Sequence, residues 1–391
     1  MEGGSMLGSP PRLKLSDLEL IKIVGKGAFG SVGVVKVKKG SPKHPWNISG
    51  AQMAIKIFRK DNLRERAPNV TRAKADAVRE FLPNRERRNL SMLEWHPFIA
   101  GMYACLQDSK NLYLLTELGH LGSLKELIRD RGPLPTSVCR FYFANLVLAL
   151  EFLHGNKLIH CDLKPENIVI GADGYLMICD LGISGFRDEK RNWNLVGTTE
   201  YTSPEALKGQ VQEEIVESVD WWALACILYE MATAKLVFWN LEGELYGEVA
   251  QKQNMDLVRR IIACEWSWPT NMEIDPVLKN IVERMLHPDF EKRIGCIVPM
   301  LEQDEGPLKN EEIRAHRFVR KFPWKKMGRT GLVAPFAPTH VPDASEEEWH
   351  THPLPQQKDV PGLVVVEPSH QIRTYKRERK KKIQGRQEYE E

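Results

Sequence analysis

The chain has 391 residues, of which 42% are hydrophobic and 27% charged, and its formal net charge is +3. This length predicts two to three domains or one large two-lobed enzyme, with ample apolar content for a packed core. The net charge is too small to indicate nucleic acid as a general partner.

The seven cysteines are scattered and form no C-x-x-C pair, which argues against a zinc site and against a disulfide framework. No run of 18 apolar residues occurs, and the first twelve residues lack a hydrophobic signal region. These features predict an intracellular, cytoplasmic protein without a membrane partner.

Residues 1–14 are rich in Gly, Ser and Pro, and we expect them to be disordered. The next stretch reads as a strand, a glycine-rich turn at Gly25, Gly27 and Gly30, and a second strand. The same glycine spacing occurs in dinucleotide-binding folds, but there it opens a helix. Because Gly30 leads directly into strand-forming residues, we favour a hairpin whose backbone can approach phosphate oxygens. A plain hairpin turn is the alternative.

A further strand contains Ala54 and Lys56. Residues 72–94 are helix-forming but contain Pro83, which predicts a helix boundary there. Residues 111–124 read as a strand that leads into a linker. The segment 138–157 is apolar on most faces, which predicts a buried helix with Gly155 near its end.

The segment 157–167, KLIHCDLKPEN, carries an acid at Asp162, a cation at Lys164 and an amide at Asn167. Phosphoryl transfer requires a group that accepts a hydroxyl proton, a positive charge and a magnesium ligand, and these three side chains supply them. A strand then leads to Asp180, in the sequence Asp-Leu-Gly.

These motifs resemble those of protein kinases of the serine/threonine type. Phrases such as HPFI, VDWWAL and VAPFAP are similar to the AGC group, which includes the cyclic-nucleotide-dependent kinases. The resemblance implies an α+β, two-lobed fold with a small antiparallel β-sheet lobe, one main helix and a mainly helical large lobe. We expect the kinase domain at 15–318, divided at about 116 and 120, and a tail extension at 319–391.

The resemblance also implies ATP and Mg²⁺ as cofactors, and a transfer of the γ-phosphate to Ser or Thr hydroxyls. Catalytic roles fall to Asp162, Lys164, Asn167, Lys56 and its partner Glu86, with Glu80 as the alternative partner. Asn167 and Asp180 would hold the metal. The residues expected to bind ATP are Gly25, Gly27, Ala28, Phe29, Gly30, Val32, Ala54, Lys56, Thr116, Glu117 and Leu118.

Substrate contacts are implied for Glu166, Glu200, Glu230 and Thr198, and the three acids predict protein substrates with basic residues near the target hydroxyl. The resemblance further implies that Thr198 contacts Asp162 and Lys164, that Glu205 pairs with Arg293, and that Asp220 supports the catalytic loop.

Two departures from the family pattern coincide. Cys161 stands where an arginine normally receives a phosphate from the activation segment, and Asn194 stands where the phosphorylated threonine is expected. We therefore hypothesise that activity does not require phosphorylation of this segment. A pseudokinase that binds nucleotide and acts as a scaffold is the alternative function.

The tail has acidic residues and Trp349 but no clear aromatic docking motif, so its docking stays open at this stage. Its basic run at 373–386 is either a solvated charge run in a partly disordered end, or a signal for nuclear import or an acidic partner.

Overall fold

The computed structural model describes residues 13–27, 30–38, 50–60, 84–187, 198–208, 217–238, 248–296, 309–337 and 355–365. The described residues belong to two compact units. The sheet unit draws on residues 1–80, 102–118 and 342–391, and the helical unit on residues 81–101 and 119–341.

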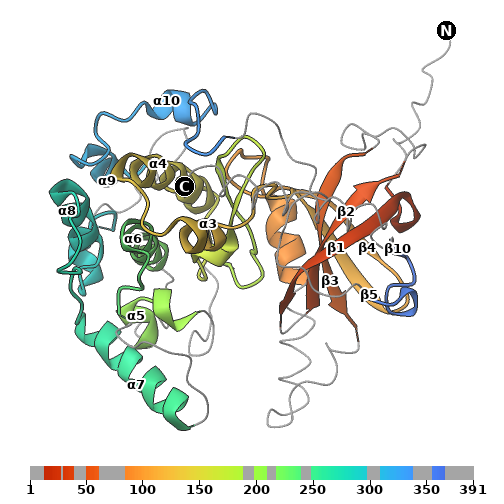
Figure 1. Ribbon diagram of the computed structural model, residues 1–391, viewed down its shortest axis with the longest axis horizontal. Helices are drawn as coiled ribbons and strands as arrows, with labels where there is room; N and C mark the ends of the chain where they lie inside the picture. Colours follow the sequence, from red (N-terminus) through yellow and green to blue (C-terminus); the bar gives the residue numbers. More distant parts are fainter. Residues whose placement is uncertain are drawn as a thin grey trace, which may run out of the picture. The chain divides into compact units, whose positions relative to one another are not determined.

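The sheet unit is built on one six-stranded sheet in the order β10-β1-β2-β3-β5-β4. Neighbouring strands are antiparallel except for β10, which runs parallel to β1 (Figure 1). The strands are β1 (Leu18–Gly27), β2 (Gly30–Val37), β3 (Gln52–Arg59), β4 (Met102–Gln107), β5 (Asn111–Thr116) and β10 (Val364–Val365). Short 3-10 turns lie at Leu15–Asp17 and Gln357–Asp359.

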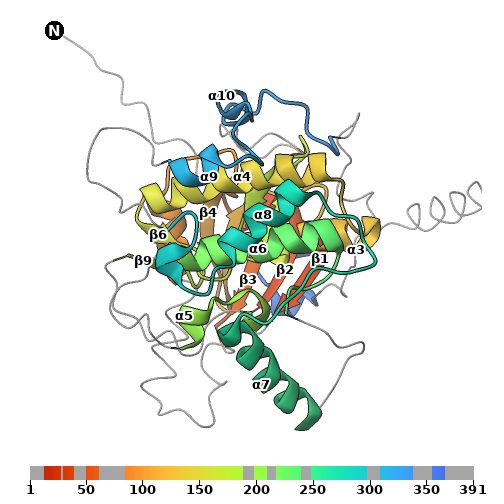
Figure 2. The ribbon, with the colours of Figure 1, turned by 90° about the vertical axis from the view of Figure 1, so that its left-hand side faces the viewer.

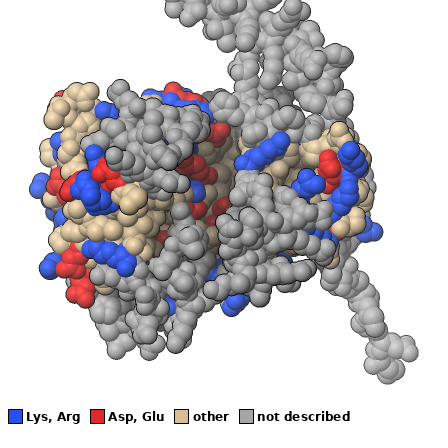
Figure 3. Space-filling view, turned by 90° about the horizontal axis from the view of Figure 1, so that it is seen from below, with Lys and Arg blue, Asp and Glu red and all other residues tan. Residues whose placement is uncertain are grey.

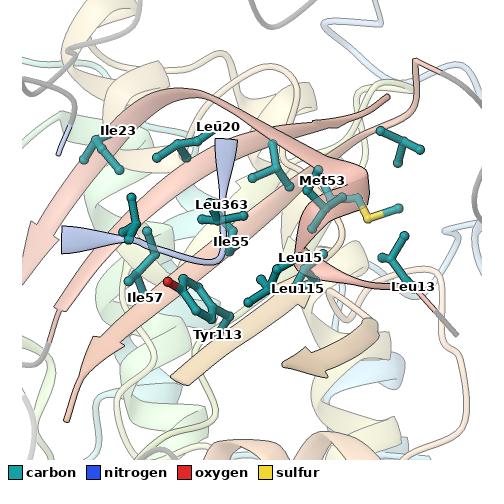
Figure 4. Packing of buried hydrophobic residues seen from close by; sticks show 14 residues of the cluster. Leu13, Leu15, Leu20, Ile23, Met53, Ile55, Ile57, Tyr113, Leu115 and Leu363 are labelled. Carbon is teal, nitrogen blue, oxygen red and sulfur yellow. The ribbon is translucent and has the colours of Figure 1, made fainter. Parts of the chain in front are cut away.

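The core of the sheet unit lies on one face of this sheet, because successive side chains of a strand point to opposite faces. Met53, Ile55 and Ile57 of β3 are buried on the core face, and Ala54 and Lys56 alternate with them. Figure 4 shows the β3 side chains in one cluster with Tyr113 and with Leu363.

The C-terminal segment 355–365 docks on this core face. Val360 and Leu363 are 3% and 1% exposed within the cluster. The backbone N–H of Gly362 donates to Asp108 Oδ2 at 3.0 Å, and Asn111 Nδ2 donates to the carbonyl of Asp359 at 2.8 Å. Asp108 also accepts a hydrogen bond from the Tyr113 hydroxyl. Residues about 250 positions apart along the chain therefore complete one core.

These contacts refine the expected small lobe. Its sheet is antiparallel as expected, except that the docked tail adds β10 in parallel to β1. Leu13, within the expected disordered start, is 9% exposed and packs in the same core. Part of the tail extension therefore belongs to the sheet unit, since its apolar side chains complete the core there.

The helical unit contains most of the helices (Figure 2). They are α3 (Leu124–Arg131), α4 (Thr136–Gly155), α5 (Pro204–Leu207), α6 (Ser218–Thr233), α7 (Glu248–Ala263), α8 (Pro276–Met285), α9 (Glu311–Ala315) and α10 (Trp324–Met327). Two small two-stranded antiparallel sheets pair β6 (Leu158–Ile159) with β9 (Gly185–Phe186) and β7 (Ile168–Ile170) with β8 (Leu176–Ile178).

Helix α6 is at the centre of the helical unit and contacts both α4 and α8 (Figure 2). Nearly every side chain of α6 is buried, in accord with its predominantly apolar sequence. Helix α4 is long and apolar enough to cross a membrane by length and composition alone, but 72% of its apolar window is buried inside the unit. The expected helix at 138–157 is thus confirmed as a core helix.

The boundaries of the large lobe also differ from expectation. Residues 319–337 belong to the helical unit, where Tyr175 Oη donates to the carbonyl of Leu332 at 2.7 Å and Phe336 packs beside Tyr142. Helical residues 84–92, expected in the small lobe, also belong to this unit. Arg85 and Asn89 donate hydrogen bonds to the carbonyl of Ser184. These bonds link residues 84–92 to the helical unit.

We predict that Leu363→Ala lowers the free energy of unfolding of the sheet unit by about 2–5 kcal/mol, the range for removing a fully buried leucine side chain. Val364 is the matched control, because it is 39% exposed and its change to alanine removes little buried surface. Thermal or urea unfolding of both variants provides the measurement. Equal effects of the two substitutions would show that the tail does not contribute to the core.

Candidate active site

The segment predicted as the catalytic loop, residues 157–167, contains β6, ends in a 3-10 turn at Pro165–Asn167 and leads into β7. The backbone at Cys161 has φ = 68°, a left-handed conformation that is costly for a residue with a Cβ. Such a conformation persists only where surrounding contacts hold it.

Those contacts come from Asp220, in the first turn of α6. Its Oδ2 accepts the backbone N–H of His160 at 2.8 Å, and its Oδ1 accepts the N–H of Cys161 at 2.9 Å. His154 Nε2 lies 2.9 Å from the same Oδ2. Burial alone raises the pKa of the Asp220 carboxyl, but the hydrogen bonds and charges of the two histidines outweigh burial and lower it. Asp220 therefore supports the catalytic loop, as predicted.

Asp162 is held by contacts to both of its carboxylate oxygens. Oδ1 accepts from the backbone N–H of Thr198 at 3.0 Å and from its hydroxyl at 3.2 Å. Oδ2 accepts from Asn167 Nδ2 at 3.1 Å and lies 2.9 Å from Lys164 Nζ. Lys164 also donates to the Thr198 hydroxyl at 2.5 Å. The predicted contacts of Thr198 are thus confirmed, and four residues form one hydrogen-bonded group.

The β7–β8 hairpin brings Asn167 close to the Asp-Leu-Gly segment. Ile168 pairs with Ile178, and the N–H of Cys179 donates to the carbonyl of Asn167 at 2.9 Å. Asp180 follows directly. Because Asn167 Nδ2 donates to the carbonyl and carboxylate of Asp162, its amide oxygen is the atom left for other ligands.

An amide oxygen and a carboxylate are donors that Mg²⁺ prefers, and Mg²⁺ usually takes its remaining ligands from water and phosphates. Asn167 and Asp180 therefore fit the predicted metal. Among the residues that the structure describes, no group of three or more His, Cys, Asp or Glu side chains has the arrangement of a metal centre.

Glu86 is buried on the helix at 84–92, at 4% exposure. This helix contacts the Asp-Leu-Gly segment, since Asn89 Nδ2 donates to the carbonyl of Leu181 at 3.0 Å. Glu86 Oε2 would lie 3.7 Å from a Cβ added at Gly182, so its carboxylate is directed toward this segment. Glu80, the alternative glutamate, lies outside the described residues.

In the sheet unit, the strand register places several residues predicted to bind ATP on one face. Lys56 pairs with Val32, and Ala54 pairs with Thr116. Directly paired residues of an antiparallel sheet share a face, and residues two apart on a strand do too. Val32, Ala54, Lys56 and Thr116 therefore share the face opposite Ile55. Lys56 Nζ lies 5.4 Å from the centroid of the Phe58 ring.

The segment after β5 carries the predicted hinge residues. Leu118 is 6% exposed and packs with Val34 in a second apolar cluster that also includes Ala54. The Thr116 hydroxyl donates to the carbonyl of Glu117 at 3.4 Å. The sequence-predicted hinge is therefore adjacent to an apolar surface on the Lys56 face.

Gly30, at the end of the glycine turn, is a position where the structure requires glycine. A Cβ at Gly30 would lie 1.9 Å from the carbonyl oxygen of Ile57, so no larger residue fits beside β3. A Cβ at Gly25 would meet only Val32, at 3.7 Å, an ordinary contact. Gly27 is the last residue of β1, and Ala28 and Phe29 lie outside the described residues.

The predicted substrate acids lie around a lysine that the sequence analysis did not single out. Lys125 Nζ is 2.8 Å from Glu230 Oε1 and 3.7 Å from Glu166 Oε1. Glu200 lies close enough to raise the pKa of Lys125. Lys125 is separated from Glu230 by 105 residues, so no local pattern links the two.

The segment after Thr198 is fixed by the predicted ion pair of Glu205 and Arg293. Arg293 Nη1 and Nη2 lie 2.7 and 3.0 Å from the two carboxylate oxygens, and both side chains are buried. A bidentate, buried pair of this kind fixes geometry strongly. Residues 188–197, with Asn194, lie outside the described residues.

The sheet unit with its lysine-bearing strand and the helical unit with its Asp-Lys-Asn loop together define the protein kinase class. Residues 18–304 match the family model described as Protein kinase domain. The chain belongs to this family.

Three curated relatives illustrate the relationship. Serine/threonine protein kinase ypkA of Aspergillus fumigatus is 31% identical over 359 residues, which cover 90% of this chain and 49% of the relative. A cAMP-dependent protein kinase, catalytic subunit-like protein of Caenorhabditis briggsae is 30% identical, with 88% and 83% covered. Human ribosomal protein S6 kinase alpha-4 is 28% identical, with 85% and 39% covered. The resemblance to AGC serine/threonine kinases is confirmed, and the chain spans about half the length of the first of these relatives.

We predict that Asp220→Asn lowers kcat about 10- to 100-fold while the protein stays folded. Asparagine retains one acceptor oxygen, so one of the N–H groups of His160 and Cys161 faces an amide NH₂ instead. A lost hydrogen bond to a charged group corresponds to about 1.5–3 kcal/mol, and each 1.36 kcal/mol is about tenfold in rate.

Asp275→Asn is the matched control for this substitution. Asp275 caps α8 by accepting the N–H of Val277, and asparagine caps helices about as well as aspartate. Steady-state kinetics and circular dichroism of both variants provide the measurement. A kcat for Asp220→Asn equal to that of the control would contradict the role of Asp220.

Proposed function

We propose that this chain is an active serine/threonine protein kinase that transfers the γ-phosphate of ATP to protein hydroxyls. The observation that carries the proposal is the Asp162 group, in which Thr198, Asn167 and Lys164 fix both carboxylate oxygens. A carboxylate fixed in this way is suited to accept the proton of a substrate hydroxyl.

The same proposal assigns roles in binding the metal and ATP to the other predicted site residues. Mg²⁺, held by Asn167 and Asp180, would neutralise charge on the phosphates. Lys56, with Glu86 as its partner, would orient the phosphates. The ATP contacts are assigned to Gly25, Gly27, Ala28, Phe29, Gly30, Val32, Ala54, Thr116, Glu117 and Leu118.

The proposed substrates carry basic residues near the target hydroxyl. Glu166 and Glu200 support this, because they follow Asp162 and Thr198 by four and two residues and so lie near the point of transfer. On the face in Figure 3, described Lys and Arg side chains are interspersed with acidic ones.

The proposed location is the cytoplasm. The seven cysteines all lie in the described part of the chain and none of them forms a disulfide there, in accord with a reducing compartment. The basic run at 373–386, a candidate nuclear-import signal, lies outside the described residues.

The direct test is phosphate transfer from ATP to a serine peptide with arginines. Asp162→Asn is expected to lower kcat about 10²- to 10⁴-fold, the usual contribution of a general base, while a fluorescent ATP analogue still binds. Asp173→Asn is the control, because Asp173 accepts the Tyr175 N–H in the β7–β8 turn, where asparagine is also favourable. If wild-type transfer were no faster than that of Asp162→Asn while nucleotide still bound, the pseudokinase alternative would be correct.

We further propose that activity does not depend on phosphorylation of the activation segment. The Cys161 side chain lacks the positively charged guanidinium with which an arginine binds a phosphate, and its backbone N–H is held by Asp220. The end of the segment is fixed by Glu205 and Arg293.

The expected result is that phosphatase-treated enzyme retains its kcat, and that tandem mass spectrometry of active enzyme finds no stoichiometric phosphate between residues 183 and 203. A phosphate at these positions whose removal abolishes activity would refute the proposal. Asp162→Asn enzyme purified in parallel shows whether any phosphate found arises from self-phosphorylation.

A further inference from the structure

Lys125, in the first turn of α3, lies among carboxylates contributed by distant segments of the helical unit. Its ammonium donates to Glu230 Oε1 at 2.8 Å and lies 3.7 Å from Glu166 Oε1. Its side chain is 37% exposed, whereas that of Glu230 is 4% exposed. The lysine thus reaches from the surface to a buried acid.

Glu230 has both oxygens engaged. Oε1 accepts from Lys125, and Oε2 accepts from the buried hydroxyl of Tyr201 at 2.5 Å. A buried carboxylate requires a cation or several hydrogen bonds to stay charged, and Lys125 supplies the cation from within the chain. Burial lowers the pKa of Lys125, but the hydrogen bond to Glu230 and the charges of Glu230, Glu166 and Glu200 outweigh burial and raise it. Lys125 is therefore charged at neutral pH.

These acids lie next to the proposed point of transfer. Glu166 follows Asp162 by four residues, and Glu200 follows Thr198, whose N–H binds Asp162, by two. A peptide that brings its hydroxyl to Asp162 must therefore place neighbouring residues near these carboxylates. A basic side chain of that peptide would compete with Lys125 for them.

We propose that Lys125 is a specificity-determining residue that occupies this acidic subsite and weakens selection for a basic substrate residue there. The proposal rests on the proposed kinase function. Three carboxylates and one ammonium leave the subsite acidic overall. Lys125 therefore reduces the increase in kcat/KM that a substrate arginine brings, but an arginine is still preferred. The same lysine limits the number of hydrogen-bond acceptors that an incoming guanidinium can reach on Glu230.

The test is a set of serine peptides in which one arginine is moved through the positions upstream of the serine, each compared with alanine at that position. The readout is the ratio of kcat/KM for arginine to that for alanine. Lys125→Met keeps the aliphatic stem but removes the charge. It is expected to raise this ratio about tenfold at one upstream position, the size of one additional charge-assisted hydrogen bond.

Three further variants separate the subsite role from a structural one. Lys125→Arg retains the charge and should keep the wild-type ratio at every position. Lys292→Met removes an equivalent lysine from the surface pair with Asp289 and should also leave the ratios unchanged. Adding Glu230→Gln to Lys125→Met should remove the gain, because the vacated acceptor is then no longer charged.

An unchanged ratio at all positions in Lys125→Met would overturn the proposal, provided that transfer still depends on Asp162. Lys125→Leu, which is neutral and also leaves the Glu230 oxygen vacant, serves as a second neutral variant if Lys125→Met unfolds, and the same tenfold gain is expected. Absence of Asp162-dependent transfer to every peptide in the wild-type enzyme would instead refute the kinase function itself.

Discussion

The hydrogen bonds that Asp220 accepts are the interaction on which the active site depends. One fully buried carboxylate binds the N–H groups of His160 and Cys161 and is paired with His154. It holds Cys161 in a left-handed conformation that otherwise costs about 1–3 kcal/mol. The next residue is Asp162, so the position of the proposed catalytic base follows from the hydrogen bonds of a buried side chain in the first turn of α6.

Buried ion pairs also hold the segments around the catalytic loop in place. Glu205 and Arg293 form a bidentate pair beyond Thr198, and Lys125 neutralises Glu230 near the proposed substrate path. In each case one partner is almost completely buried, so loss of the other would leave an uncompensated charge. These buried pairs therefore fix the positions of their segments more firmly than an exposed ion pair could.

The sequence predicted those parts of the site whose residues are close along the chain. Asp162, Lys164 and Asn167 lie within six residues, and their chemistry could be inferred from side-chain type and spacing alone. Thr198 and Asp220 came only from the family resemblance. Lys125 could not be predicted, because its partner is 105 residues away. The docking of the tail stayed open for a similar reason: Asp108 and Gly362 are 254 residues apart, and β10 has only two residues.

Amide hydrogen exchange at His160 and Cys161 tests the role of Asp220 most directly. If the carboxylate holds the loop, both N–H groups should exchange only through large-scale opening of the helical unit, as slowly as the amides of α6. In Asp220→Asn enzyme, protection of at least one of them should fall toward that of surface turns. Rapid exchange of both amides in the wild-type protein would contradict the account.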